Sequence, residues 1–385
     1  MSQEERKRKH VKAKLADVRA IAAVNFKSAS PMPLGLIGPV GIAKTQFLKN
    51  DFRAMYAEHL GLSVDQVGLI HERVANRDSA EIAGVALPMK DADGNVMTKF
   101  TKPPLITKIQ ESGLEHGVIL FDELLQASAD IQKVLADVLD PEERTLAGWA
   151  IPDGWIVAFT GNRVQDKSGA TRMLSHLNNR VLILELKFDI EVWAKWAEAN
   201  DVNPLAIDCA MTYHGEGFFD EAVPTADCAF CTPRSLVRAA DQLTAFMDSD
   251  DFDGVTIPKF MQILLGGVIG ERAAGTLCRH IAMADQVPTG PEIHADPEGA
   301  TVPDSTGYQL LAANRAINSA ETASTGEAAL QYITRLRPDL QVSLGSKLLR
   351  LSAKRGWVLT SSTATAFIAK FHELLPLAEA TGMEV

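Results

Sequence analysis

A glycine-rich octet near the N-terminus has the residue types and the spacing to hold phosphate groups. It reads Gly38-Pro39-Val40-Gly41-Ile42-Ala43-Lys44-Thr45 and continues into Gln46. Glycines let the backbone curl so that successive N–H groups point at one anion, and a following helix directs the positive end of its dipole to the same place. Lys44 would reach the β- and γ-phosphates of a nucleotide, and the Thr45 hydroxyl would ligate Mg²⁺. The segment from Gly38 to Gln46 therefore predicts a nucleotide-binding loop.

The octet departs from the usual pattern, G-x-x-x-x-G-K-[ST], at one position. The last glycine of that pattern is Ala43 in this chain. A methyl group there restricts φ and crowds the loop, so the sequence leaves open whether nucleotide binding is weakened. A Gly/Pro-rich turn at a strand end, without a ligand, is the alternative interpretation.

A second candidate site follows an apolar run further along the chain. The run is Gly-Val-Ile-Leu-Phe at residues 117–121, and Asp122 and Glu123 come directly after it. In phosphoryl transfer the first such carboxylate holds the Mg²⁺ shell, and the second orients or deprotonates an attacking water. An acidic pair at a helix N-terminus is the simpler alternative. Together with Lys44 and Thr45, the pair favours a site for ATP and Mg²⁺, with Thr45 and Asp122 at the metal.

A set of short apolar runs separated by helix-length segments must position these residues. The runs cover residues 34–37, 67–70, 117–121, 155–159 and 181–186. Several are continuous rather than alternating, as in strands that are covered on both faces. An alternating pattern of this kind predicts an α/β core with a parallel sheet over about residues 30–187.

Two short insertions and a long helical part complete the predicted organisation. Residues 85–100 read as a hairpin around an Asp-Gly turn, and residues 144–154 as a shorter one. After residue 188 apolar residues recur at spacings of three and four, over 190–199, 204–213, 233–246, 258–284 and 308–375. Residues 286–306 carry four prolines and read as a surface connection. We expect parts at 1–187, 188–285 and 286–385.

Composition and charge exclude several classes of protein. The 385 residues are 46% hydrophobic and 23% charged, as in folded globular proteins rather than disordered ones. The longest apolar stretch, residues 261–270, is too short to cross a bilayer. The N-terminus has no secretory signal pattern, which predicts a cytoplasmic protein without a membrane segment. The net charge of −11 argues against nucleic acid as a partner, although seven basic residues lie in the first 20 and predict a solvated basic helix.

The chain resembles the AAA+ ATPases, and more narrowly their MoxR-like branch. Besides the loop and the acidic pair, Phe-Thr-Gly-Asn-Arg at 159–163 is similar to the sensor-1 strand, and the resemblance implies that Asn162 positions the attacking water. The segment 169–180 is similar to the one that carries the arginine finger, which makes Arg180 the first choice and Arg172 its competitor, with Arg163 as a third possibility. Cys-Thr-Pro-Arg-Ser-Leu at 231–236 is similar to sensor 2, with Arg234 near the γ-phosphate.

The resemblance carries expectations about fold, activity and partners. It implies a P-loop NTPase core of the AAA+ type, an α-helical lid and a helical C-terminal extension. It also implies Mg²⁺-dependent ATP hydrolysis by a homo-oligomer, a hexamer in that family, with chaperone-like action on a partner protein that contains a von Willebrand factor A domain. Two alternatives stay open at this point: a nucleic-acid motor of the same superfamily, and an ATP-gated assembly switch with little hydrolysis.

Overall fold

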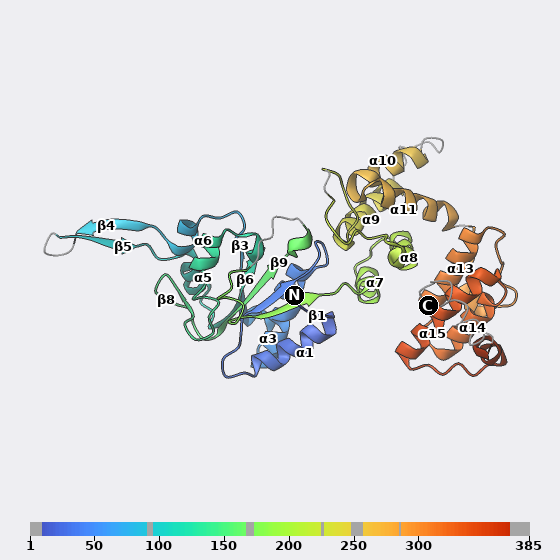
Figure 1. The fold of residues 1–385 in the computed structure, drawn as a ribbon, viewed down its shortest axis with the longest axis horizontal. Helices are drawn as coiled ribbons and strands as arrows, with labels where there is room; N and C mark the ends of the chain where they lie inside the picture. The colour runs from blue at the N-terminus through green and yellow to red at the C-terminus, as the bar shows by residue number, and fades with distance from the viewer. Residues whose placement is uncertain are drawn as a thin grey trace, which may run out of the picture. The chain divides into compact units, whose positions relative to one another are not determined.

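The chain divides into a unit built around a sheet and a helical unit. The computed structural model describes residues 10–90, 95–166, 173–224, 227–247, 257–284 and 286–369. The sheet unit contains Met1–Asp189 together with Asp220–Asp227 and Thr232–Arg234. The helical unit contains Ile190–Phe219, Cys228–Cys231 and Ser235–Val385 (Figure 1).

A six-stranded parallel sheet forms the centre of the sheet unit. Its strands are ordered β1-β10-β2-β9-β6-β3 and paired in parallel throughout. Their bounds are β1 (Val11–Ala13), β2 (Leu34–Ile37), β3 (Val67–Arg73), β6 (His116–Asp122), β9 (Trp155–Gly161) and β10 (Leu182–Leu186). The predicted fold class is confirmed, because all five predicted runs are strands of one parallel sheet.

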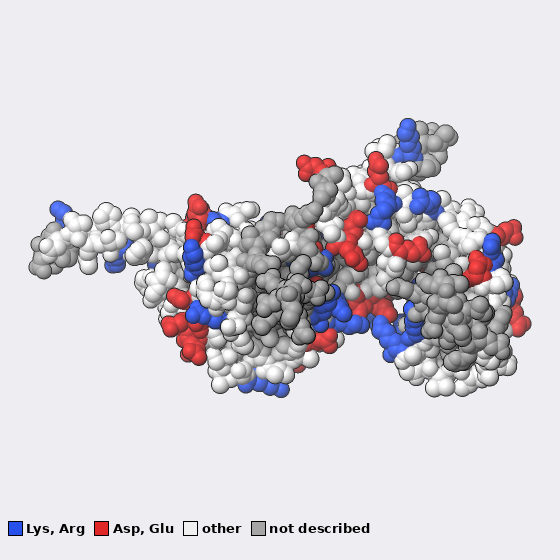
Figure 2. Space-filling view, in the orientation of Figure 1, with Lys and Arg blue, Asp and Glu red and all other residues white. Residues whose placement is uncertain are grey.

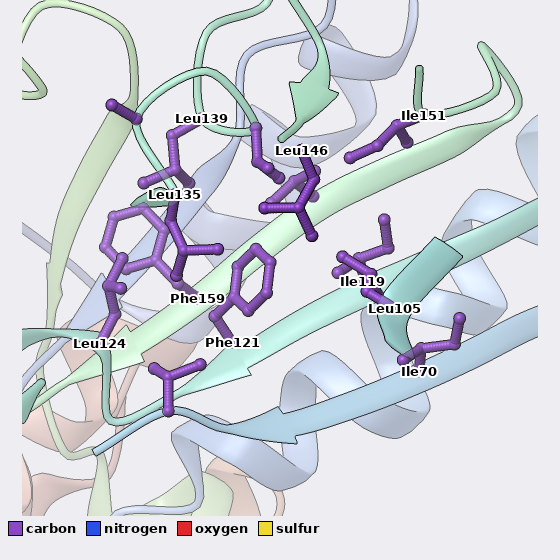
Figure 3. Packing of buried hydrophobic residues seen from close by; sticks show 14 of the residues in the cluster. Ile70, Leu105, Ile119, Phe121, Leu124, Leu135, Leu139, Leu146, Ile151 and Phe159 are labelled. Atoms are coloured by element: carbon purple, nitrogen blue, oxygen red, sulfur yellow. The ribbon is translucent and has the colours of Figure 1, made fainter. Parts of the chain in front are cut away.

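Helices cover both faces of this sheet, which explains the continuous apolar runs. Val118 and Leu120 of β6 face a core shared with α1 (Leu15–Phe26), α2 (Lys44–Phe47) and α3 (Arg53–Leu60). Ile119 and Phe121 face the opposite core, which α4 (Ser79–Ala83), α5 (Pro104–Ser112) and α6 (Ala129–Val134) close. Figure 3 shows Phe121 and Phe159 on this second face, packed below Leu135 and Leu146. Alternate residues of a strand point to opposite faces, so both sets must be apolar.

The basic N-terminal segment differs from its prediction. The sequence predicts a helix through residues 9–18, but Val11–Ala13 form β1, which pairs in parallel with Leu184–Leu186 of β10. The helix α1 starts only at Leu15, where Asp17 accepts a hydrogen bond of 2.9 Å from the Lys14 backbone amide. The physical reason is the open edge of β10, since an unpaired strand edge offers hydrogen bonds that an isolated short helix cannot match.

Both predicted hairpins are present. The first consists of β4 (Ala86–Lys90) and β5 (Val96–Phe100), and its predicted Asp-Gly turn lies at residues 91–94, outside the described residues. The second consists of β7 (Thr145–Leu146) and β8 (Trp149–Ala150). The first hairpin extends away from the six-stranded sheet (Figure 1), and the surface of the hairpin carries few charges (Figure 2).

The helical unit differs from the sequence pattern at two places. Residues 258–284 form two helices rather than one, because Gly270 adopts a φ of +79° between them, and a Cβ there would lie 2.5 Å from the carbonyl oxygen of Ala229. The predicted connection at 286–306 contains a helix, which begins at a capping box of Thr289 and Glu292. The bounds are α7 (Ile190–Ala199), α8 (Pro204–Tyr213), α9 (Pro233–Met247), α10 (Ile257–Ile269), α11 (Glu271–Ala284), α12 (Gly290–Ala295), α13 (Thr306–Asn318), α14 (Ala323–Ile333) and α15 (Pro338–Arg355).

The last four of these helices share one apolar core. Leu311, Ile317, Leu330, Tyr332 and Leu348 are all buried in it. Among the described residues, none of the helices combines the length and the apolar character that crossing a membrane requires.

Candidate nucleotide-binding site

The carboxyl ends of three neighbouring strands bring the predicted site residues together. β2, β9 and β6 are adjacent, with Ile37 beside Gly161 and Phe121 beside Phe159 in the register. The glycine-rich loop follows β2, Asp122 ends β6 with Glu123 directly after it, and Asn162 follows β9. In an open parallel sheet, ligands bind outside these strand ends, so the topology gathers three separate motifs at one edge.

The glycine-rich loop leaves backbone donors for an anion. Gly38 donates its amide to the carbonyl of Gly161 at 3.3 Å, which fixes the start of the loop. The amides of Gly41 and Ile42 donate to no acceptor within the part of the chain that the structure describes. Gly41 has a φ of +81°, and a Cβ on it would lie 2.6 Å from the Thr232 hydroxyl oxygen. Glycine is therefore required at position 41 both by the backbone and by the contact with Thr232.

Ala43 keeps the conformation that a glycine would have, at a cost in strain. Its φ is 65° and its ψ is 22°, in the left-handed region, and its side chain is exposed. The crowding expected from the methyl group is therefore wrong, whereas the expected restriction of φ is real. A residue with a Cβ in this region costs roughly 1–2 kcal/mol.

Replacing Ala43 by glycine is expected to stabilise the sheet unit. The strain is removed, but glycine adds freedom to the unfolded chain, so the net gain is about 0.5–1 kcal/mol. The midpoint of thermal unfolding, followed by circular dichroism, should rise by roughly 1–3 °C. Ala20→Gly, inside α1, is the matched control and should lower the midpoint because helical glycine destabilises. A fall in the unfolding midpoint of both variants would show that the backbone of Ala43 is not strained.

Lys44 is buried inside the loop. Its ammonium donates to the carbonyl oxygens of Gly38 at 2.8 Å and Pro39 at 2.7 Å, and to Asn162 Oδ1 at 3.1 Å. Burial lowers the pKa of Lys44 from 10.5 to about 8, and the neighbouring carboxylates oppose this shift only in part. A phosphate group beside it would favour the charged form.

Asp122 accepts hydrogen bonds on both of its oxygens. Thr45 Oγ1 donates to its Oδ1 at 2.8 Å, and the Thr160 hydroxyl donates to the same oxygen. His71 Nε2 lies 3.2 Å from Oδ2. Burial raises the pKa of Asp122, but the hydrogen bonds from Thr160, Thr45 and His71 outweigh burial and hold that pKa below its usual value. The aspartate is therefore ionised at neutral pH.

The donor set around Thr45 and Asp122 fits Mg²⁺. This ion prefers oxygen ligands and is usually bound by one or two carboxylates together with substrate phosphates and waters. A hydroxyl oxygen and an ionised carboxylate, 2.8 Å apart and beside the glycine-rich loop, offer that combination. Thr45 and Asp122 are the residues that would hold the ion.

Glu123 has a strained backbone and an exposed side chain. Its φ is 61°, and its amide donates to the Thr160 hydroxyl oxygen at 2.9 Å. Within the described residues its carboxylate makes no hydrogen bond or ion pair. Strain of this kind gathers where a side chain must be presented in one direction. Glu123 is thus available to a water molecule, whereas the carboxylate of its neighbour Asp122 contacts Thr45, Thr160 and His71.

Asn162 and Arg163 have different environments. Asn162 accepts its hydrogen bond from Lys44 and so lies at the glycine-rich loop. Arg163 is bound within its own unit: its guanidinium donates to Asp166 at 2.8 Å and to the Glu221 carbonyl at 2.7 Å. Arg163 therefore has a structural role. Its partner Asp166 is almost fully buried, and its charge partly opposes the lowering of the Lys44 pKa by burial.

The three arginines predicted to act on the nucleotide differ in where the structure places them. Arg234 is the exposed second residue of α9, its Cβ lies 3.4 Å from where a Cβ on Gly41 would be, and its charge lowers the pKa of Lys44. Arg180 is not at the loop of its own chain; its Nε is 3.1 Å from Asp140 Oδ2, and about a third of its side chain is exposed. Arg172 lies outside the described residues.

Four residues of the site had no role assigned from the sequence. They are His71, Thr160, Asp166 and Thr232. A signal was available for Thr160, because it precedes Asn162 by two residues at the same strand end. His71 and Asp166 become visible only when β3, β6 and β9 are placed side by side.

Comparisons with known proteins found only distant similarity to this chain. No protein-family model matches the chain, and no curated protein sequence matches it. Among solved structures, a point mutant of RuvB from Thermotoga maritima is similar over 71% of this chain and 69% of that one, with 14% identity and a TM-score of 0.35. NtrX from Brucella abortus in complex with ADP is similar over 89% and 67%, with 15% identity and a TM-score of 0.37. These similarities are too distant to assign a chemistry, so the interpretation of the site rests on the residues of this chain.

Proposed function

We propose that this chain is a Mg²⁺-dependent ATPase of the AAA+ class, of the MoxR-like type, which converts ATP to ADP and phosphate. It acts as a homo-oligomer, a hexamer by resemblance, and uses the cycle to remodel a partner protein. One observation carries the proposal: Lys44, the first residue of α2 after the loop that follows β2, donates to Asn162 at 3.1 Å, while Thr45 donates a hydrogen bond to Asp122. Three motifs from separate parts of the sequence converge there.

Each residue has a distinct role in this proposal. The loop amides and Lys44 bind the β- and γ-phosphates, and Thr45 with Asp122 would hold Mg²⁺, which neutralises charge on the phosphates. Glu123 accepts a proton from the attacking water, and Asn162 orients that water. Arg234 approaches the phosphates from α9 of the same chain. Arg180 completes the site of a neighbouring copy, so hydrolysis depends on assembly.

Release of phosphate from ATP tests the enzymatic part of the proposal. Wild-type protein should release phosphate steadily in the presence of Mg²⁺, with a specific rate that rises with protein concentration as oligomers form. Lys44→Ala should be inactive, because the loop loses the cation that holds the phosphates. Equal rates for the wild type and Lys44→Ala would refute the proposal. A wild type that assembles with ATP without releasing phosphate would be a switch rather than an ATPase.

Binding of the nucleotide is expected to take up a proton at alkaline pH. The pKa of Lys44 is about 8 in the free protein, and phosphate charges raise it in the complex. At pH 9 roughly 0.9 protons should therefore enter per nucleotide bound, and affinity should fall as pH rises above about 8. Calorimetric titrations of ADP at pH 9, in two buffers with different ionisation enthalpies, measure this uptake. No uptake at pH 9 would contradict the placing of Lys44 at the phosphates.

The β4–β5 hairpin supports the coupling to a partner protein. Large apolar side chains of the hairpin, and of Val85 directly before it, are about half exposed or more, namely Val85, Leu87, Met89, Val96, Met97 and Phe100. Contiguous exposed apolar surface commonly marks an interaction site. A partner with a von Willebrand factor A domain stays part of the proposal on the resemblance alone.

A further inference from the structure

A cavity in the helical unit has a mixed apolar and cationic lining that the nucleotide site does not explain. Its volume is about 400 Å³, and its lining comes from α7, α8, α13 and α15, which are labelled in Figure 1, and from His214, directly after α8. The residues of the loop at 38–45 are not among those that line it. Cavities of roughly 300–1,000 Å³ are the usual size for small organic ligands.

The cationic side of the cavity is one face of α15. Lys347, Arg350 and Lys354 recur at spacings of three and four, so they lie along the same side of the helix. With Arg355 they give four cations, against the carboxylates of Glu191 and Asp339. The lining thus has a formal charge of about +2, in a chain with a net charge of −11.

Some of these cations are already paired and others are not. Lys354 is 2.6 Å from Glu191, and Arg355 donates to the Ala320 carbonyl. Arg350 has no hydrogen bond or ion pair with any residue that the structure describes. Lys347 donates to Asn314 Oδ1, which uses one of the three protons of its ammonium. Two protons of Lys347 and the whole guanidinium of Arg350 are thus available to an anion.

An unpaired amide adds a second polar feature. Asn318 lines the cavity, and its Nδ2 is buried without a hydrogen-bond partner among the described residues. It lies one helical turn after Asn314, the partner of Lys347, so the two donors belong to the same end of the cavity. A buried donor without a partner is costly, and an acceptor group on a ligand would remove that cost.

Much of the remaining wall is apolar, and His214, Ser343 and Ser346 also line it. The apolar part comes from Ile190, Met211, Ile317, Val342 and Leu351. Burial also lowers the pKa of Lys347, because this wall replaces water around the ammonium. The carboxylate of Glu216 opposes this shift, and an anion placed beside Lys347 would likewise favour the charged form.

We propose that this cavity binds a small organic anion, whose carboxylate, phosphate or sulfonate contacts Lys347, Asn318 and Arg350 and whose apolar body packs against Ile190, Met211 and Ile317. The site is separate from the nucleotide loop in sequence and in residues. The helical unit would therefore bind this anion independently of any ligand of the sheet unit.

A pair of fluorescent probes tests this proposal on the full-length protein. 1-Anilinonaphthalene-8-sulfonate carries an aromatic body with one sulfonate, and N-phenyl-1-naphthylamine has the same rings without the charge. In Lys347→Met the affinity for the anionic probe should fall about tenfold or more, since a charge-assisted hydrogen bond is lost. The affinity for the neutral probe should be unchanged. Lys195→Met, on α7 outside the cavity, is the matched control and should bind both probes as the wild type does.

Arg350→Gln is a second variant that keeps the test decisive if Lys347→Met folds poorly. Arg350 is exposed, so its replacement leaves the core intact. It should weaken the anionic probe several-fold and leave the neutral one unaffected. The proposal is overturned if the wild type does not bind the anionic probe, or if both variants bind it as tightly as Lys195→Met. If a variant loses affinity for both probes together, the probes bind an apolar surface rather than an anion site, and the proposal is also overturned.

Discussion

Replacing Glu123 by glutamine should reduce ATP turnover by about 10²–10⁴-fold while the nucleotide still binds. The structure leaves the Glu123 carboxylate without a partner in the described residues, whereas Asp122 is bonded to Thr45, Thr160 and His71. Glutamine has the same size but accepts no proton, so the loss corresponds to roughly 3–5 kcal/mol in the barrier. Phosphate release and retention of radiolabelled ATP measure the two effects separately.

Glu115→Gln is the matched control for this variant. Glu115 precedes the opposite end of β6 and is exposed, so the same change of charge is made away from the site. Its turnover should equal that of the wild type. A Glu123→Gln protein that hydrolyses ATP as fast as Glu115→Gln would show that Glu123 is not the base.

Replacing Arg180 by alanine should lower turnover by about 10³–10⁵-fold, the range measured when an arginine finger is removed. Arg180 is partly exposed and lies at Asp140 rather than at the loop of its own chain, so in our proposal it acts on a neighbouring copy. Binding of ATP should be almost unchanged, because the guanidinium acts on charge that develops during transfer. Asp140→Ala removes the same ion pair but keeps the arginine, and it should retain most of the activity.

A mixture of two inactive variants tests whether Arg180 acts between copies. Arg180→Ala subunits keep Glu123, and Glu123→Gln subunits keep Arg180. In mixed oligomers some interfaces combine an intact Glu123 with an intact Arg180 from the neighbour, so activity should reappear on mixing. A mixture no more active than its two components would contradict the role of Arg180, and an equivalent loss in Arg172→Ala instead would assign the finger to Arg172.

Much of the sheet unit follows from local patterns in the sequence. The runs that form β2, β3, β6, β9 and β10 are continuous and apolar, and they are separated by segments long enough to cross back over a sheet. Right-handed crossovers then leave few topologies. Lys44 and Thr45 could be named because the spacing of the octet is itself the signal.

Other features depend on contacts that no local pattern encodes. β1 forms because the edge of β10 is available, although its residues Val11–Ala13 fit a helix equally well. His71 meets Asp122 only because β3 and β6 pair in the sheet, and Thr232 meets Gly41 across about 190 residues of sequence. In contrast, the break at Gly270 and the cap at Thr289 were encoded locally by a glycine and by a capping box.

The central claim is that the phosphates of a nucleotide bind at Lys44, and equilibrium titration with Mg·ATP tests it most directly. Isothermal calorimetry of the wild type should show one nucleotide bound per chain. Lys44→Ala should weaken binding by roughly 10–100-fold through loss of charge-assisted hydrogen bonds, whereas Lys49→Ala, five residues further along, should bind as the wild type does. Equal affinity in Lys44→Ala and Lys49→Ala, or a wild type that does not bind Mg·ATP at millimolar concentration, would contradict the account.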